Sequence, residues 1–194
     1  FSKANAYNLW YGSLIYGTML IGLWAVFLWL PTWLQTIVQN DDGQKERGIS
    51  MMLFAIGGLG GGFISGWVSN FMGMKKAMLI CFGACFACSM ILFNFNETLT
   101  VFSYLEIGII ALFFGISQGV LNAYIPALFP VNIRSAATGF CFNIGRVFTA
   151  SAVFFVGWLV NVLGGYGHAL TIFSFIFLAG FIICMMLKEK KFIQ

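Results

Sequence analysis

Long apolar runs separated by short polar turns dominate the sequence. A helix that crosses a bilayer needs about 20 mostly apolar residues. Six runs of that length can be read, without the alternation of apolar and polar residues that marks a transmembrane strand. They cover residues 11–35, 48–71, 77–95, 99–124, 136–162 and 168–187. The pattern therefore predicts an all-α membrane protein with six transmembrane helices.

The composition supports this location. Of the 194 residues, 60% are hydrophobic and 8% are charged, and the mean hydropathy is +0.93. Because a soluble domain carries about a quarter charged residues, this chain has too little polar surface for a water-facing globule. Its ten basic residues are too few and too dispersed for a nucleic-acid surface. Five cysteines and one histidine form no metal-ligand or catalytic pattern, so we expect no enzyme activity, metal or cofactor.

Loop charges predict the orientation of the spans. One side has Lys45 and Arg47, beside three acidic residues. The other collects most of the basic residues, namely Lys3, Lys75, Lys76, Arg134, Lys188, Lys190 and Lys191. Since cytoplasmic loops carry an excess of lysine and arginine, both chain ends are expected in the cytoplasm. We expect an integral, multi-pass protein of the bacterial cytoplasmic (inner) membrane.

Polar residues inside the spans are candidates for a substrate and ion pathway. A charge near the bilayer centre costs about 3 kcal/mol, and Arg146 lies about 15 Å into its span at 1.5 Å per residue. Its fork of donors suits a carboxylate or polyhydroxyl substrate, and internal pairing with a carboxylate is the alternative. The predicted pathway comprises Arg146, Asn143, Gln118, Asn122, Glu106, Ser117, Tyr16 and Trp24.

Three features of these spans leave two interpretations open. Glu106 is the only acidic residue well inside a span, and it is either a proton or substrate site or a structural carboxylate near the interface. Trp24 faces either lipid or a substrate-facing wall. In the second span, glycines between Gly57 and Gly62 leave a face without side chains, which favours static close packing or a hinge.

Two turns resemble motifs of the major facilitator superfamily. The family places Gly-x-x-x-Asp-x-x-Gly-x-Lys/Arg-Lys/Arg between its second and third helices, and a degenerate copy between its eighth and ninth. The turn after the second span matches this pattern through Gly66, Gly73, Lys75 and Lys76, with Asn70 in place of aspartate. After the fourth span, the chain is similar to Tyr-x-Pro-Glu-Leu-Phe-Pro-x-x-x-Arg of the metabolite:proton and sugar porter branches, with Ala127 where glutamate is usual. A Thr-Gly-x-x-x-Asn-x-Gly-Arg pattern similar to that of the same branches follows this motif. Across the two patterns, the matching residues are Tyr124, Pro126, Leu128, Phe129, Pro130, Arg134, Thr138, Gly139, Asn143, Gly145 and Arg146.

The resemblance implies the C-terminal half of a twelve-helix transporter, built from two inverted three-helix repeats. Residues 1–194 would form a single half-domain, with the N-terminal half missing from the chain. The implied function is proton-coupled secondary transport of a small organic metabolite, an organic anion or a sugar, by rocking of the two halves. The implied partners are the substrate, protons, the lipid bilayer and the N-terminal half.

The implied cytoplasmic gate comprises Gly66, Asn70, Gly73, Lys75, Lys76, Tyr124, Pro126, Pro130 and Arg134. The alternative to a two-half transporter is a self-contained six-span protein, channel-like or oligomeric.

Overall fold

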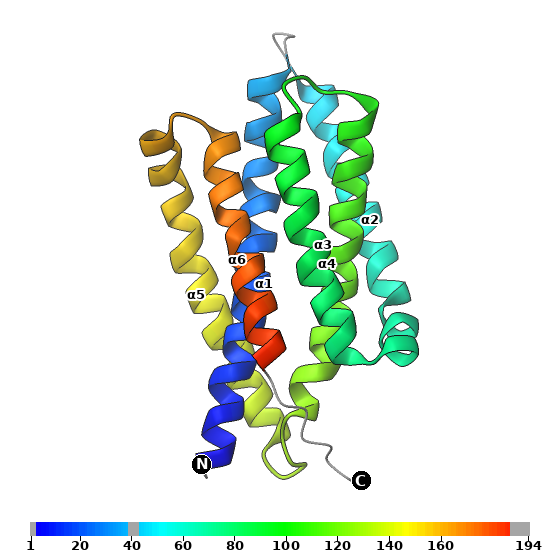
Figure 1. Ribbon diagram of the computed structural model, residues 1–194, viewed down its shortest axis with the longest axis vertical. Helices are drawn as coiled ribbons and strands as arrows, with labels where there is room; N and C mark the ends of the chain where they lie inside the picture. The colour runs from blue at the N-terminus through cyan, green and yellow to red at the C-terminus, as the bar shows by residue number, and fades with distance from the viewer. Residues whose placement is uncertain (1–2, 39–42, 187–194) are drawn as a thin grey trace.

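The computed structural model describes residues 3–38 and 43–186, and within them every regular element is a helix (Figure 1). The six helices are α1 (Lys3–Ile37), α2 (Gln44–Met72), α3 (Met74–Phe95), α4 (Val101–Ala127), α5 (Arg134–Leu163) and α6 (Tyr166–Met186). All six are long and apolar enough to cross a membrane. The predicted six-helix membrane fold is therefore confirmed.

The helices extend beyond the apolar runs. α1 has 35 residues and begins at Lys3, well before the predicted start of its span at residue 11. At 1.5 Å per residue it is about 52 Å long, whereas the hydrocarbon core of a bilayer is about 30 Å thick. Backbone hydrogen bonding thus carries the helix past the apolar segment. The loop and tail residues Asp41, Asp42, Lys188, Lys190 and Lys191, which entered the orientation argument, lie outside the described residues.

The helix packing has an internal twofold relation. α1 lies against α5, α2 against α4, and α3 against α6. The relation exchanges α1 with α4, α2 with α5 and α3 with α6. It turns the α1–α5 contact into the α4–α2 contact, and the α1–α6 contact into the α4–α3 contact. All of these contacts are present. This is the arrangement expected of two inverted three-helix repeats.

Glycines permit the closest contact between two helices. A Cβ added at Gly57 of α2 would lie 2.5 Å from the carbonyl oxygen of Gly108 on α4. One added at Gly61 would clash with the carbonyl oxygen of Leu112, and one added at Gly115 of α4 would clash with the backbone of α2. Small residues allow membrane helices to approach in this way. The close packing predicted for the glycine-rich face of the second span is confirmed.

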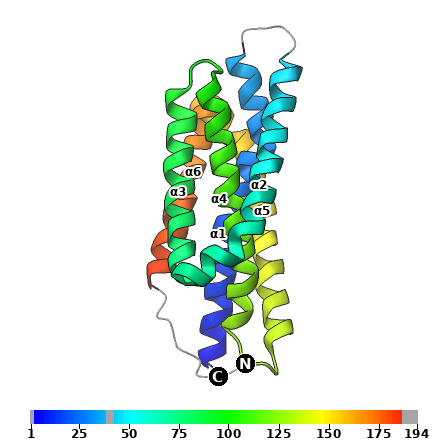
Figure 2. The same cartoon turned by 90° about the vertical axis from the view of Figure 1, so that its right-hand side faces the viewer.

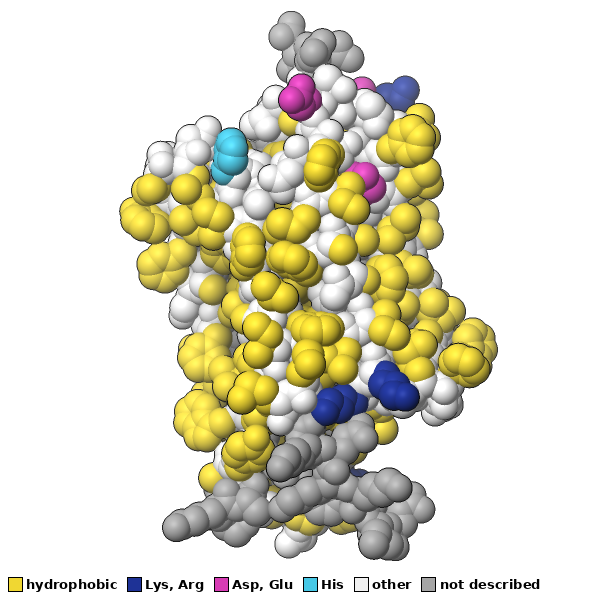
Figure 3. All heavy atoms as spheres, viewed as in Figure 1, with side chains coloured by type: hydrophobic (Ala, Val, Ile, Leu, Met, Phe, Trp, Pro, Cys, Tyr) yellow, Lys and Arg dark blue, Asp and Glu magenta, His cyan; other side chains and the backbone are white. Residues whose placement is uncertain are grey.

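On the face shown in Figure 3, apolar side chains cover the middle of the molecule, and charged side chains lie towards its two ends. The start of α1 and the end of α6 lie at the same end as the α2–α3 and α4–α5 turns (Figure 1). Lys75 and Arg134 lie at the starts of α3 and α5, next to these two turns, whereas Lys45 and Arg47 lie in the first turn of α2 at the opposite end. Because the number of described spans is even, the first helix starts and the last helix ends at the same end of the bundle.

α2 and α5 lie along one side of the bundle (Figure 2), and both helices have exposed large apolar residues. On α2, Phe63 is 81% exposed and Phe71 is 90% exposed. On α5, Phe154 is 86% exposed and Trp158 is 62% exposed. α3 and α6 pack on the other side of the bundle, against α4 and α1. The inner helices α1 and α4 are consequently the best covered, and they carry most of the core.

Candidate functional site

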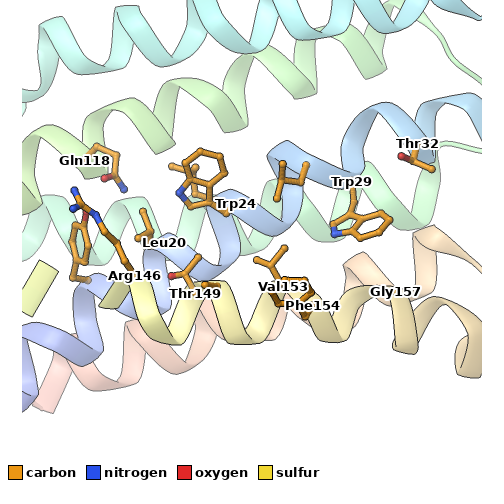
Figure 4. A pocket seen from close by; sticks show the side chains of 14 residues that line it. Leu20, Trp24, Trp29, Thr32, Gln118, Arg146, Thr149, Val153, Phe154 and Gly157 are labelled. Carbon is orange, nitrogen blue, oxygen red and sulfur yellow. The ribbon is translucent and has the colours of Figure 1, made fainter. Parts of the chain in front are cut away.

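A cavity of about 1140 Å³ opens between α1, α4 and α5 (Figure 4). Its walls are mainly apolar with a few polar groups, the usual composition of a small-molecule site. Four residues of the predicted pathway line it, Arg146, Gln118, Tyr16 and Trp24. The full lining is Tyr16, Leu20, Leu23, Trp24, Leu28, Trp29, Thr32, Gln118, Arg146, Thr149, Ala150, Val153, Phe154 and Gly157.

Arg146 and Gln118 point into the same end of this cavity, the first from α5 and the second from α4 (Figure 4). The amide nitrogen of Gln118, Nε2, is buried and has no hydrogen-bond partner among the described residues. A buried donor left unpaired costs about 1–3 kcal/mol. No carboxylate of the described chain lines the cavity. This end therefore presents N–H donors that an acceptor from outside the chain can satisfy.

Tyr16 forms the α1 wall beside Arg146. Its ring stacks on Phe142, with ring centroids 4.5 Å apart and planes 29° apart. Gly145 leaves the space that this ring occupies, because a Cβ there would lie 2.6 Å from Cδ1 of Tyr16. A Cβ at Gly17 would lie 3.5 Å from Cα of Gly145. α1 and α5 thus cross at these two glycines, and the crossing sets the position of Arg146, the next residue of α5.

Two tryptophans of α1 form an aromatic wall along the cavity (Figure 4). Trp24 is 39% exposed and meets Phe27 edge-on, with ring centroids 5.5 Å apart. Trp29 lies farther along α1, with its ring 5.7 Å from that of Tyr166. Its indole nitrogen Nε1 is buried without a partner among the described residues. Of the two interpretations of Trp24, the structure places the side chain on the cavity wall.

The structure does not bring Asn143, Asn122 and Ser117 to the cavity. Ser117 is fully buried, and its Oγ donates a hydrogen bond to the carbonyl oxygen of Phe114 at 2.7 Å. It follows that its hydroxyl is used within α4, about 100° around the helix from Gln118. Asn122 and Asn143 are exposed, and each lies about one turn outside the cavity lining on its own helix. Their short amides do not span that turn.

Glu106 holds the start of α4 against the end of α3. Its Oε2 accepts a hydrogen bond from Nδ2 of Asn96 at 2.7 Å. Oδ1 of Asn96 accepts one from Oγ of Ser103 at 2.5 Å, and Ser103 forms a capping box with Thr100 at the start of α4. Glu106 does not line the cavity. This geometry matches the interpretation of Glu106 as a structural carboxylate.

The α2–α3 turn lies apart from the cavity. Gly73 joins the two helices with φ of 86°, a left-handed conformation that favours glycine. Nζ of Lys75 donates a hydrogen bond to the carbonyl oxygen of Met185 at 3.3 Å, so the cation meets the C-terminal end of α6, where the helix dipole favours it. The other predicted gate residues of this turn are exposed, namely Gly66, Asn70 and Lys76.

The α4–α5 turn is closed by its own hydrogen bonds. Nε of Arg134 donates to the carbonyl oxygen of Phe129 at 3.3 Å. Pro126 lies in the last turn of α4, and Pro130 lies in the turn that follows. Tyr124 is buried on α4, with 6% of its surface exposed. These predicted gate residues shape the end of the bundle and do not line the cavity.

Ten lining residues were missed by the sequence analysis, because most are apolar or small: Leu20, Leu23, Leu28, Trp29, Thr32, Thr149, Ala150, Val153, Phe154 and Gly157. Helical spacing carries a signal for several of them. Steps of three or four residues from Arg146 reach Ala150, Val153 and Gly157 on one face of α5. The same steps from Tyr16 follow the lining of α1. An arginine in a span can therefore serve as the origin for predicting a cavity face.

Three curated proteins are similar to most of this chain. The niacin transporter NiaP of Acinetobacter baylyi is 24% identical over 178 residues, which cover 91% of this chain and 39% of that protein. The probable 4-methylmuconolactone transporter of Cupriavidus pinatubonensis is 26% identical over 168 residues, with coverages of 84% and 37%. The probable galactarate/D-glucarate transporter GudP of Bacillus subtilis is 26% identical over 181 residues, with coverages of 82% and 39%.

The chain thus spans about two-fifths of the length of these relatives. All three are named as transporters and none as an enzyme. The family model described as Major Facilitator Superfamily matches residues 1–150, well over half of the chain. The matched region includes α1 to α4 and the part of α5 that carries Arg146. The resemblance found in the two turns is confirmed, and the chain belongs to the major facilitator superfamily.

Proposed function

We propose that this chain is one six-helix half of a secondary transporter that moves a small organic anion by alternating access. The observation that carries the proposal is the cavity end formed by Arg146 and the unpartnered amide of Gln118. Arg146 lies twelve residues into the 30-residue helix α5, about 18 Å from its start. A guanidinium binds a carboxylate through two parallel hydrogen bonds. An anion would offset the cost of placing this charge at that depth in the membrane.

The cavity offers hydrogen-bond donors more than acceptors, which favours an anion over a cation. Arg146, Nε2 of Gln118 and Nε1 of Trp29 are all donors, and the last two have no partner among the described residues. No carboxylate of the described chain lies in the wall to attract a cation. Niacin and galactarate, after which two of the relatives are named, are carboxylic acids. Both observations support a carboxylate as the transported group.

A second half-bundle would complete the cavity, and rocking of the two halves would open it to each side in turn. The apolar faces of α2 and α5 lie on one side of the bundle, where such a half could pack (Figure 2). The greater length of the relatives leaves room for it. Lys75, Lys76 and Arg134 would lie on the cytoplasmic side of a bacterial inner membrane.

Proton coupling belongs to the proposal, with the proton carrier in the second half. The cavity of the described chain has no aspartate or glutamate in its wall. Glu106 is occupied by its hydrogen bond to Asn96 at the α3–α4 turn. Uptake into proteoliposomes with and without an inward proton gradient tests this point. Equal accumulation under both conditions would contradict proton coupling and leave the anion site in place.

The anion site is tested by Arg146→Gln in the full-length protein, with radiolabelled nicotinate and galactarate as the first probes. Loss of a hydrogen bond to a charged group removes about 1.5–3 kcal/mol, so uptake should fall about 10- to 150-fold. Arg47→Gln is the matched control, because Arg47 lies in the first turn of α2 and donates a hydrogen bond to Oε1 of Gln35 at 2.8 Å, outside the cavity lining. Wild-type uptake by Arg146→Gln would refute the site.

A further inference from the structure

Between the Arg146 end of the cavity and Trp29, the wall is mainly apolar. Leu20, Leu23 and Val153 lie along it. The hydroxyl of Thr149 is used within α5, where it donates a hydrogen bond to the carbonyl oxygen of Gly145 at 2.8 Å. A polyhydroxylated ligand would place several hydroxyl groups against side chains that offer them no partner, which is unfavourable when water is excluded. This wall therefore suits a ligand with an apolar body.

The charge of the lining points to a ligand with one carboxylate. Arg146 is the only charged side chain of the described residues that lines the cavity. One guanidinium pairs with one carboxylate in its bidentate arrangement. A second carboxylate on the same small ligand would lie against apolar side chains of this half, and an unpaired charge is far more costly to bury than a hydroxyl.

Trp24 presents an aromatic surface beside the Arg146 end (Figure 4). Its ring meets Phe27 edge-on, with planes at 87°. Phe27 lies 5.5 Å from Phe54 of α2, which lies 5.9 Å from Phe114 of α4, measured between ring centroids. This row of rings, from Phe27 on α1 to Phe114 on α4, supports the indole on one side. A surface fixed before binding loses little freedom when a ligand packs on it.

We infer that Trp24 is the platform on which the ring of a planar monocarboxylate stacks, and that it selects such acids over polyhydroxylated diacids. Trp24 lies two turns beyond Tyr16 on α1, about 12 Å along the helix at 1.5 Å per residue. The carboxylate would be held by the Arg146 side chain, and the ring would lie towards Trp24 along the same cavity wall. The inference rests on the proposed function, because it requires Arg146 to hold the carboxylate.

The test compares uptake of radiolabelled nicotinate, benzoate and galactarate by the full-length protein in proteoliposomes. The first two are planar monocarboxylates, and the third is a polyhydroxylated diacid. The wild type should take up the planar acids with the lower KM. Trp24→Leu should raise the KM for the planar acids about 10-fold, since aromatic packing beyond simple burial is of that size. Trp24→Phe keeps a ring and should restore most of the affinity.

Trp10→Leu is the control, because Trp10 is an exposed tryptophan of α1, like Trp24, that does not line the cavity. It should leave all three KM values unchanged. A wild type that prefers galactarate, or a Trp24→Leu variant whose KM rises equally for all three acids, overturns the inference while the proposed function stands. A wild type that transports no organic anion of a wider panel overturns the proposed function itself. If Trp24→Leu does not fold, Trp24→Met gives the same comparison.

Discussion

Replacing Gly145 by alanine tests whether the α1–α5 crossing holds Arg146 in place. The new Cβ would lie 2.6 Å from Cδ1 of Tyr16, 3.3 Å from the backbone nitrogen of Gly17 and 3.4 Å from its Cα. Ordinary contacts of this kind begin at 3.4 Å. The Tyr16 ring, already stacked on Phe142, must therefore move by about 1 Å, or the two helices must separate.

The expected cost follows from this overlap. Overpacking of a close-packed interior by one methyl group costs about 1–3 kcal/mol, and a domain of this size loses roughly 2–4 °C of Tm for each kcal/mol. The uptake rate should fall by more than the loss of stability alone explains, because Arg146 follows Gly145 directly. A misplacement of about 1 Å at a positioning group can lower a rate by about 10²-fold.

The assay pairs thermal unfolding of the full-length protein in detergent with uptake in proteoliposomes. Gly139→Ala is the matched control on α5, since a Cβ there would meet no atom within 4 Å. It should keep wild-type uptake and Tm, or raise Tm slightly through the better helix propensity of alanine. Gly17→Ala adds a Cβ at an ordinary 3.5 Å contact distance from Gly145. Its effect should lie between those of the other two variants.

Equal behaviour of Gly145→Ala and Gly139→Ala would refute this reasoning. It would mean that the Tyr16 ring moves aside without an energetic cost and that the crossing does not set the position of Arg146. A lower Tm without any loss of uptake would refute only the claim that the crossing positions Arg146 for transport. In that case the crossing would stabilise the bundle without positioning the arginine.

Three further predictions concern other contacts between helices. Gly61→Ala should lower Tm, because its Cβ would overlap the backbone of α4 and such overpacking costs about 1–3 kcal/mol. Gly62→Ala should leave Tm unchanged, because a Cβ there would meet no atom within 4 Å. Equal Tm values for the pair would show that α2 and α4 separate freely. Asn96→Leu should lower Tm by removing the hydrogen bond to Glu106 at 2.7 Å, with KM unchanged. Glu106→Gln keeps an acceptor oxygen and should leave proton-driven uptake near the wild type, so a specific loss of that uptake would contradict a structural role for Glu106.

The sequence predicted the features of the fold that are governed by the bilayer. Six apolar runs appear as six helices because the membrane imposes one length scale on each. The glycine face of α2 predicted a close contact because small residues, glycine above all, let two helix backbones approach each other. Arg146 was identified because a charge inside a span is costly unless it has a use.

The lining of the cavity was harder to predict, because the same apolar residues face lipid and cavity in a membrane protein. Leu20 and Val153 have no sequence feature that distinguishes them from lipid-facing apolar residues. Asn143 was grouped with Arg146 by its spacing of three residues, but its amide is too short to cover one helical turn. The α1–α5 crossing joins Gly17 to a glycine more than a hundred residues away, and no local pattern specifies that contact.

Substrate protection of a single introduced cysteine tests the central claim most directly. Ala150 lines the cavity one turn beyond Arg146, whereas the next residue, Ser151, is exposed on another face of α5. In the full-length protein, Ala150→Cys should react with a water-soluble maleimide above the wild-type background, and a saturating transported anion should slow this reaction. The reactivity of Ser151→Cys should not change with that anion. An Ala150→Cys rate that is the same with and without the anion would contradict a substrate site in this cavity.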